Sequence, residues 1–99
     1  MNWNDLKSRS LRIYTTPWCS DCHRLKKLLT RQGLEFSEVD VDSNASAREH
    51  MVAKAGEFSI PQLEIDDEWM VRGWHQELPS RWDEGLFFEE LAQAIPAQD

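Results

Sequence analysis

The chain has 99 residues, of which 40% are hydrophobic and 29% charged, and its net charge is −7. This length suits one domain around one core. The acidic charge argues against general nucleic-acid binding, and no apolar run approaches the roughly 18 residues of a membrane span. Residues 1–10 lack the apolar stretch of a signal peptide, so we expect a cytoplasmic protein.

The charge is distributed unevenly around the only two cysteines, Cys19 and Cys22. Residues 1–34 carry seven Lys or Arg and two Asp, a charge of +5, whereas residues 35–99 carry four basic and sixteen acidic residues, a charge of −12. A disulfide between cysteines three positions apart closes a very short loop and adds little stability. A redox or metal role is therefore favoured over a structural one.

The predicted elements begin after a polar lead-in, residues 1–10, which we expect to be frayed, with Trp3 a candidate for packing against the core. Residues 11–15 have the β-branched and aromatic content of a strand. Residues 16–18 form a turn, because the residue before a proline avoids the helical conformation. A helix with leucines at helical spacing follows from about residue 20 to residue 32, and Gly33 ends it.

The middle of the chain alternates between strand and helix patterns. A second strand is predicted over residues 35–41, with Val39 and Val41 on one face. Polar residues 42–44 then offer helix N-caps, and the helix they start should reach Ala55 and stop at Gly56. Met51, Val52 and Ala55 would form its buried stripe.

Two short strands and a helix complete the pattern. Residues 61–65 and 68–71 are predicted strands joined by a turn at Asp66–Asp67, and residues 73–85 look irregular. A last amphipathic helix, stopped by Pro96, is indicated by Phe87, Phe88, Leu91 and Ile95. The order β-α-β-α-β-β-α predicts an α/β protein whose mixed four-stranded sheet has helices on both faces, since the strand–helix–strand start gives a parallel pair and the closing hairpin an antiparallel one.

The segment Cys19-Ser20-Asp21-Cys22 lies where the first predicted strand passes into the first predicted helix. Cys19 is therefore at or just before the helix start, where backbone N–H groups are unpaired and the helix dipole is positive. Both effects favour the thiolate, so we expect a lowered pKa for the Cys19 thiol. Cys22 is expected to be more buried and placed to attack a mixed disulfide formed at Cys19.

The segment also allows three other interpretations: a haem attachment site, a zinc site and a cluster bridged between two chains. With His23 it also fits the c-type haem attachment pattern C-x-x-C-H, but the chain lacks an export signal and the strand–turn–helix context suits a redox motif better. A zinc site needs four ligands, and His50 and His75 lie far away in the sequence. A cluster bridged between two chains could still recruit Cys19. We favour no metal site, and we expect His23 to be a solvated residue on the first helical turn.

The residues around this motif resemble the glutaredoxin family of the thioredoxin superfamily, closest to the mycoredoxins and glutaredoxin-like reductases of bacteria. The resemblance is carried by residues 13–22, 24–26, 38–42 and 59–62, and it implies one thioredoxin-like domain over residues 1–99. It implies that Cys19 is the nucleophile and Cys22 the resolving thiol. It also implies a cis bond before Pro61, with the Ile60 backbone pairing to substrate as an added strand.

Several positions depart from the usual glutaredoxin pattern. Thr16 stands where many family members have a lysine that helps to bind glutathione, and Ser20-Asp21 replaces the common Pro-Tyr. The chain reads Arg72-Gly73-Trp74 where many members have a Gly-Gly pair. These departures favour a low-molecular-weight thiol other than glutathione, or a protein partner. The substrate-contacting residues expected beside Ile60 and Pro61 are Thr16, Trp18, Arg72 and Gly73.

Asp21 is expected to make the redox pair more reducing. An anion beside the thiolate disfavours it, and a destabilised thiolate makes the reduced pair a stronger reductant. We therefore expect a reduction potential nearer to that of thioredoxin, about −270 mV, than to that of the oxidant DsbA, about −120 mV.

The leading interpretation is an enzyme that reduces mixed or protein disulfides through Cys19 and Cys22. It would need no cofactor beyond this redox-active disulfide, with a low-molecular-weight thiol as co-substrate, and would act as a monomer fed by a reductase that the sequence does not identify. No nucleic acid or membrane partner is expected. The alternatives are a dedicated protein electron donor fed by thioredoxin reductase, as for ribonucleotide reductase, and an iron–sulfur or metal carrier.

Overall fold

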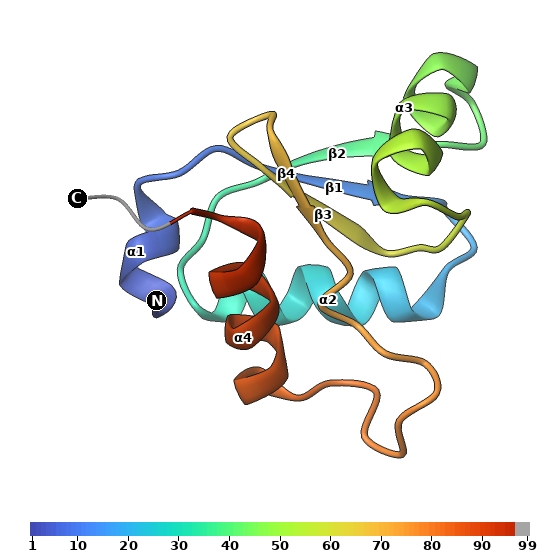
Figure 1. Ribbon diagram of the computed structural model, residues 1–99. Coiled ribbons are helices and arrows are strands. Elements are labelled where there is room, and N and C mark those ends of the chain that lie inside the picture. Colours follow the sequence, from blue (N-terminus) through green and yellow to red (C-terminus); the bar gives the residue numbers. More distant parts are fainter. Residues whose placement is uncertain (97–99) are drawn as a thin grey trace.

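The computed structural model describes residues 1–96 of the chain and shows four strands and four helices in this part (Figure 1). In chain order these are α1 (Trp3–Lys7), β1 (Leu11–Thr15), α2 (Ser20–Arg31), β2 (Ser37–Asp40), α3 (Ala45–Ala55), β3 (Gln62–Ile65), β4 (Trp69–Val71) and α4 (Glu84–Ala94). The strands are arranged β2-β1-β3-β4, with β1 parallel to β2 and the other neighbouring pairs antiparallel. The predicted mixed four-stranded sheet is confirmed.

The sheet separates two hydrophobic clusters because side chains alternate along each strand. Ile13 of β1 and Leu63 of β3 are opposite one another in the register, and both belong to the larger cluster, which includes the buried leucines of α2 and α4. Tyr14, the next residue of β1, belongs to the smaller cluster with Met51 of α3. Figure 1 accordingly shows α2 and α4 on one side of the sheet and α3 on the other.

Local signals at the ends of the two central helices match their observed limits. Cys19 is the N-cap of α2, and Gly33, one residue past its C-cap, has a φ of +78° that suits glycine. Asn44 caps α3 by accepting the N–H of Ala47, and Gly56 ends α3 with a φ of +86°. The predicted buried stripe of α3 holds only in part, since Met51 is fully buried while Val52 and Ala55 are half-buried.

The prediction of a frayed N-terminal lead-in is wrong, because residues 3–7 form a docked helix. Asn2 caps it and forms a capping box with Asp5. Leu6 is fully buried in the larger cluster. The Trp3 ring lies 5.6 Å from that of Phe87, and its indole N–H donates to Glu84 at 2.6 Å. Tertiary packing against α4 therefore holds a helix too short to be stable alone.

The irregular segment between β4 and α4 runs from Arg72 to Asp83, whereas residues 73–85 were predicted. Asp83 caps α4, so Glu84 and Gly85 belong to that helix. Trp74 and Trp82 form an isolated antiparallel bridge, and Trp74 is buried in the larger cluster. Because both indoles pack inward, the loop that they bracket is fastened to the core.

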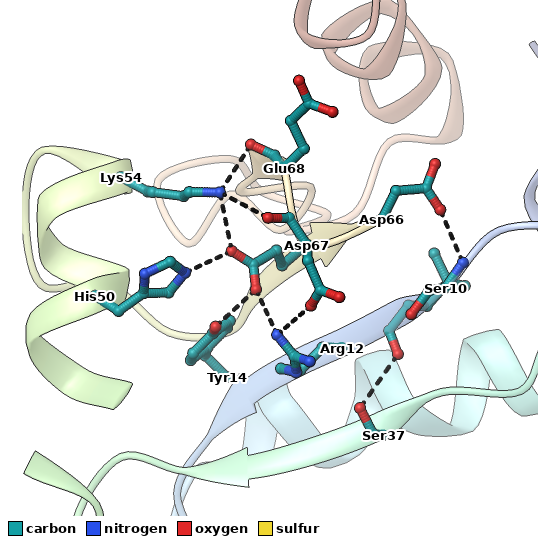
Figure 2. Close-up of polar contacts among 11 residues, drawn as sticks. Ser10, Arg12, Tyr14, Ser37, His50, Lys54, Asp66, Asp67 and Glu68 are labelled. Carbon is teal, nitrogen blue, oxygen red and sulfur yellow. Dashed lines mark hydrogen bonds and ion pairs between the residues drawn. The ribbon is translucent and has the colours of Figure 1, made fainter. Parts of the chain in front are cut away.

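A buried carboxylate joins α3 to the sheet. Glu64 of β3 is only 1% exposed and accepts hydrogen bonds from Tyr14 at 2.8 Å and Arg12 at 2.8 Å. Its second oxygen contacts His50 at 2.7 Å and Lys54 at 3.3 Å. Figure 2 shows these four side chains converging from β1 and α3. Burial acts to raise the pKa of Glu64, but hydrogen bonds from His50, Tyr14 and Lys54 hold that pKa at about 2.

The lowered pKa of Glu64 predicts that the protein loses stability in acid. A group whose pKa is lowered by folding stabilises the folded state above its unfolded-state pKa, and that contribution disappears as the pH falls through the folded-state pKa. Between about pH 6 and about pH 2, the free energy of unfolding of the wild type should fall by about 3 kcal/mol more than that of Glu64→Gln. Urea unfolding at each pH measures the difference, and parallel pH profiles for the two proteins would contradict it.

The docking of α1 predicts that Leu6 contributes to global stability. Leu6→Ala removes a fully buried side chain and should lower the free energy of unfolding by about 2–5 kcal/mol. The exposed neighbour Lys7 provides the control, since Lys7→Ala should change stability by less than about 0.5 kcal/mol. If both variants unfolded at the urea concentration of the wild type, α1 would not be part of the cooperative fold.

Candidate redox site

The two cysteines form a disulfide at the start of α2. Their Cα atoms are 5.2 Å apart. The sulfur of Cys19 accepts the backbone N–H of Cys22 at 3.1 Å, so Cys19 itself caps the helix. Cys19 is 6% exposed and Cys22 is fully buried, which confirms the predicted difference in burial. A thiolate at Cys19 would meet an N–H donor and the positive end of the helix dipole.

The segment before β3 lies beside the disulfide. The peptide bond between Ile60 and Pro61 is cis, as predicted. Ile60 is 8% exposed and belongs to the same cluster as Cys19 and Cys22, together with Tyr14, Val41 and Met51. The structure therefore brings Ile60 and the cysteine pair together from positions about forty residues apart in the sequence.

Trp18 and Thr16 flank the disulfide in different ways. Trp18 is 67% exposed, as expected for the rim of a site, and its indole N–H donates to Asp42 at 2.5 Å. Thr16 is only 1% exposed, and its hydroxyl has no hydrogen-bond partner within residues 1–96. An open aromatic surface and a buried hydroxyl thus stand on the N-terminal side of Cys19. Their contact with substrate remains a prediction.

Asp21, inside the motif, is a buried anion with counter-charges that the sequence did not reveal. It is 5% exposed. Its Oδ1 accepts from Arg24 at 2.7 Å and from Arg81 at 3.3 Å, and its Oδ2 accepts from Gln76 at 3.1 Å. Burial acts to raise the pKa of Asp21, but the two guanidinium groups lower it. The predicted electrostatic effect of Asp21 on the thiolate is therefore offset by two cations.

Arg72 and Gly73 make contacts with residues of their own loop and of α4. The Arg72 guanidinium donates to Glu77 and to the Trp74 carbonyl, and it lines a pocket formed by β4 and α4. Gly73 has a φ of +64°, and its N–H donates to Glu90 at 3.1 Å. The expected contact of Arg72 and Gly73 with substrate therefore stays a prediction.

His23 and the remaining titratable groups give no sign of a metal centre. His23 is exposed, as predicted, and its Nε2 lies 3.2 Å from the Pro17 carbonyl. Across residues 1–96, no group of three or more His, Cys, Asp or Glu side chains is placed to hold a metal ion. In the same range, no helix is long and apolar enough to cross a bilayer.

A mixed sheet whose first strand is followed, after a short turn, by a helix-capping cysteine, with a cis-proline segment in the same hydrophobic cluster as the disulfide, defines the thioredoxin-like class of fold. The crystal structure of the thioredoxin-like protein BC3987 agrees with this assignment. It superposes with a TM-score of 0.57 and 31% identity over 65% of this chain and 86% of that chain.

The family follows from the sequence comparisons. The glutaredoxin family model matches residues 11–70. Glutaredoxin 3 of Escherichia coli strain K12 is 42% identical over 57 residues, or 58% of this chain and 69% of that protein. The gene 56 protein of Mycobacterium phage L5 is 30% identical over 88 residues, or 85% of this chain and 82% of that protein. The chain belongs to the glutaredoxin family and is a thiol–disulfide oxidoreductase.

A substitution at Gly73 tests how closely the loop between β4 and α4 packs against Phe87 of α4. An added Cβ would lie 2.9 Å from Cδ1 of Phe87, at a φ that side chains rarely adopt. Gly73→Ala should therefore destabilise the protein by about 2–4 kcal/mol. Gly56→Ala is the matched control, because Gly56 has a similar positive φ but open space around it, and it should cost only about 1 kcal/mol. Equal thermal shifts for the two variants would contradict the predicted clash.

Proposed function

We propose that Cys19 is the attacking thiolate and Cys22 the resolving thiol in the reduction of disulfides. The observation that carries this assignment is the unequal placement of the two sulfurs. Cys19 caps α2, accepts an N–H and keeps some exposure, whereas Cys22 is fully buried one turn later. A lowered pKa and access to solvent suit the first attack, and a sheltered neighbour suits the second.

The reaction needs no group beyond the two sulfurs and the substrate. The Cys19 thiolate attacks a disulfide R–S–S–R, which forms the Cys19–S–S–R bond and releases R–S⁻. The Cys22 thiolate then attacks the Cys19 sulfur, which forms the Cys19–Cys22 disulfide and releases the second R–S⁻. Two electrons pass from the protein to the substrate, and an external thiol or reductase must return them.

We further propose the setting in which this exchange takes place. The co-substrate is a low-molecular-weight thiol, the protein acts as a monomer in the cytoplasm, and no metal or organic cofactor takes part. Ile60, Pro61 and Trp18 would contact the substrate, because Ile60 packs with the cysteines and Trp18 offers an exposed ring beside Cys19. The buried Thr16 would support this surface from beneath.

Single-cysteine variants test the two roles separately. After incubation of each reduced protein with bis(2-hydroxyethyl) disulfide, intact mass should show no adduct on Cys19→Ser and a stable adduct on Cys22→Ser. The wild type should lose any adduct and gain the internal disulfide, because Cys22 displaces the bound thiol. An adduct on Cys19→Ser at the wild-type rate would show that Cys22 can attack and would overturn the assignment.

A further inference from the structure

We propose that a pocket of about 360 Å³ beside Asp21, lined by Arg24, Trp74, Ser80 and Arg81, is a carboxylate-binding site that selects acidic thiol substrates for Cys19. The inference rests on the proposed function, since it concerns the substrate bound at that cysteine. Three of the lining residues, Trp74, Ser80 and Arg81, lie in the loop between β4 and α4, which the match to the family model at residues 11–70 does not reach.

The pocket has more positive charge than its own carboxylate compensates. Arg24 and Arg81 each bond Asp21 through one nitrogen, and their side chains remain 57% and 50% exposed. A guanidinium carries five N–H donors, so both keep donors for another acceptor. Among residues 1–96, no other carboxylate lies within 4.0 Å of either group. Two cations thus face one anion, which leaves one positive charge and free donors for a ligand carboxylate.

A neutral donor in the pocket wall is also without a partner. Trp74 is 94% buried, being 6% exposed, and its indole N–H has no hydrogen-bond acceptor within the described residues. A buried N–H without an acceptor is unfavourable. Trp74 therefore brings an unpaired polar group to the part of the fold where the two arginines lie.

Asp21 connects the pocket to the cysteine pair at which disulfide exchange takes place. Asp21 lies between the two cysteines in the sequence, and Gln76 and Arg81 both bind it, so the loop is fixed at the redox motif itself. When the Cys19 thiolate attacks a disulfide, the half that stays attached forms a Cys19–S–S–R bond. A carboxylate on that half could reach the arginines, whereas an ammonium group would meet like charge.

Three disulfides of similar size and different charge test this selectivity. They are 3,3′-dithiodipropionate, which is anionic, bis(2-hydroxyethyl) disulfide, which is neutral, and cystamine, which is cationic. Reduced Cys22→Ser protein is mixed with each, and adduct formation is followed by intact mass. Each rate is divided by the rate at which 2-mercaptoethanol reacts with the same disulfide. This correction removes differences in the intrinsic reactivity of the three disulfides. The corrected rate should be highest for the anion, although the net charge of −7 favours the cation.

Further substitutions in the Cys22→Ser protein test whether the pocket arginines cause this selectivity. Arg81→Gln should lower the ratio of the anionic to the cationic rate about tenfold, the effect of one lost charge-assisted hydrogen bond. Asp21→Asn should raise the ratio, because it removes the competing carboxylate. Arg31→Gln makes the same charge change on the exposed last turn of α2 and should leave the ratio within about twofold. A changed pKa of Cys19 affects all three rates alike and cancels in the ratio.

The outcomes separate this inference from the proposed function. Equal corrected rates, or an equal fall in the ratio for Arg81→Gln and Arg31→Gln, would overturn the carboxylate site while leaving Cys19 as the nucleophile. Failure of all three disulfides to form an adduct would overturn the proposed function instead. Should Arg81→Gln not fold, an unchanged ratio in Asp21→Asn would still refute the site.

Discussion

The start of α2 is the constraint on which the redox site depends. A helix leaves its first N–H groups without partners, and here the sulfur of Cys19 accepts one of them. That contact requires α2 to begin at this residue and to stay fixed against the sheet. Leu25 and Leu29, both buried in the larger cluster, seat the helix, while β1 ends only four residues before Cys19. The core thus sets the environment of a single sulfur atom.

The loop between β4 and α4 also affects the charges around the cysteine pair. Trp74 and Trp82 fasten it to the core, and Gln76 and Arg81 extend from it to Asp21. As a result, the loop places the Arg81 guanidinium beside that of Arg24 from α2, and both contact Asp21 between the two cysteines. The aromatic packing of this loop therefore helps to set the electrostatics around Asp21.

Glu64 holds α3 against the face of the sheet opposite to α2 and α4. Its carboxylate joins β3 to β1 through Tyr14 and Arg12 and to α3 through His50 and Lys54. Such a buried charge is tolerated because its oxygens are fully paired. The same helix supplies Met51 to the cluster that contains both cysteines. An ionic contact thus positions one wall of the hydrophobic surroundings of the site.

The sequence predicted what short-range patterns encode and missed what long-range pairing decides. Periodicity and capping residues predicted the order of elements from β1 onward, the mixed sheet, the limits of α3 and the helix start at Cys19. The helix at residues 3–7 was missed because five residues are too few for a periodic signal, and only the Asn2–Asp5 capping box could have indicated it. The pairing of Asp21 with Arg81 and of Glu64 with Arg12 was invisible, because it joins residues more than fifty positions apart.

The pKa of the Cys19 thiol decides whether this sulfur is the activated nucleophile. In the reduced protein, the rate of alkylation by iodoacetamide is followed as a function of pH, with the modified cysteine identified by peptide mass. We expect alkylation at Cys19 with a midpoint well below the ordinary thiol value of about 8.5, and slow modification of the buried Cys22. A midpoint at or above that value, or modification of Cys22 first, would contradict the assignment of Cys19 as the activated nucleophile.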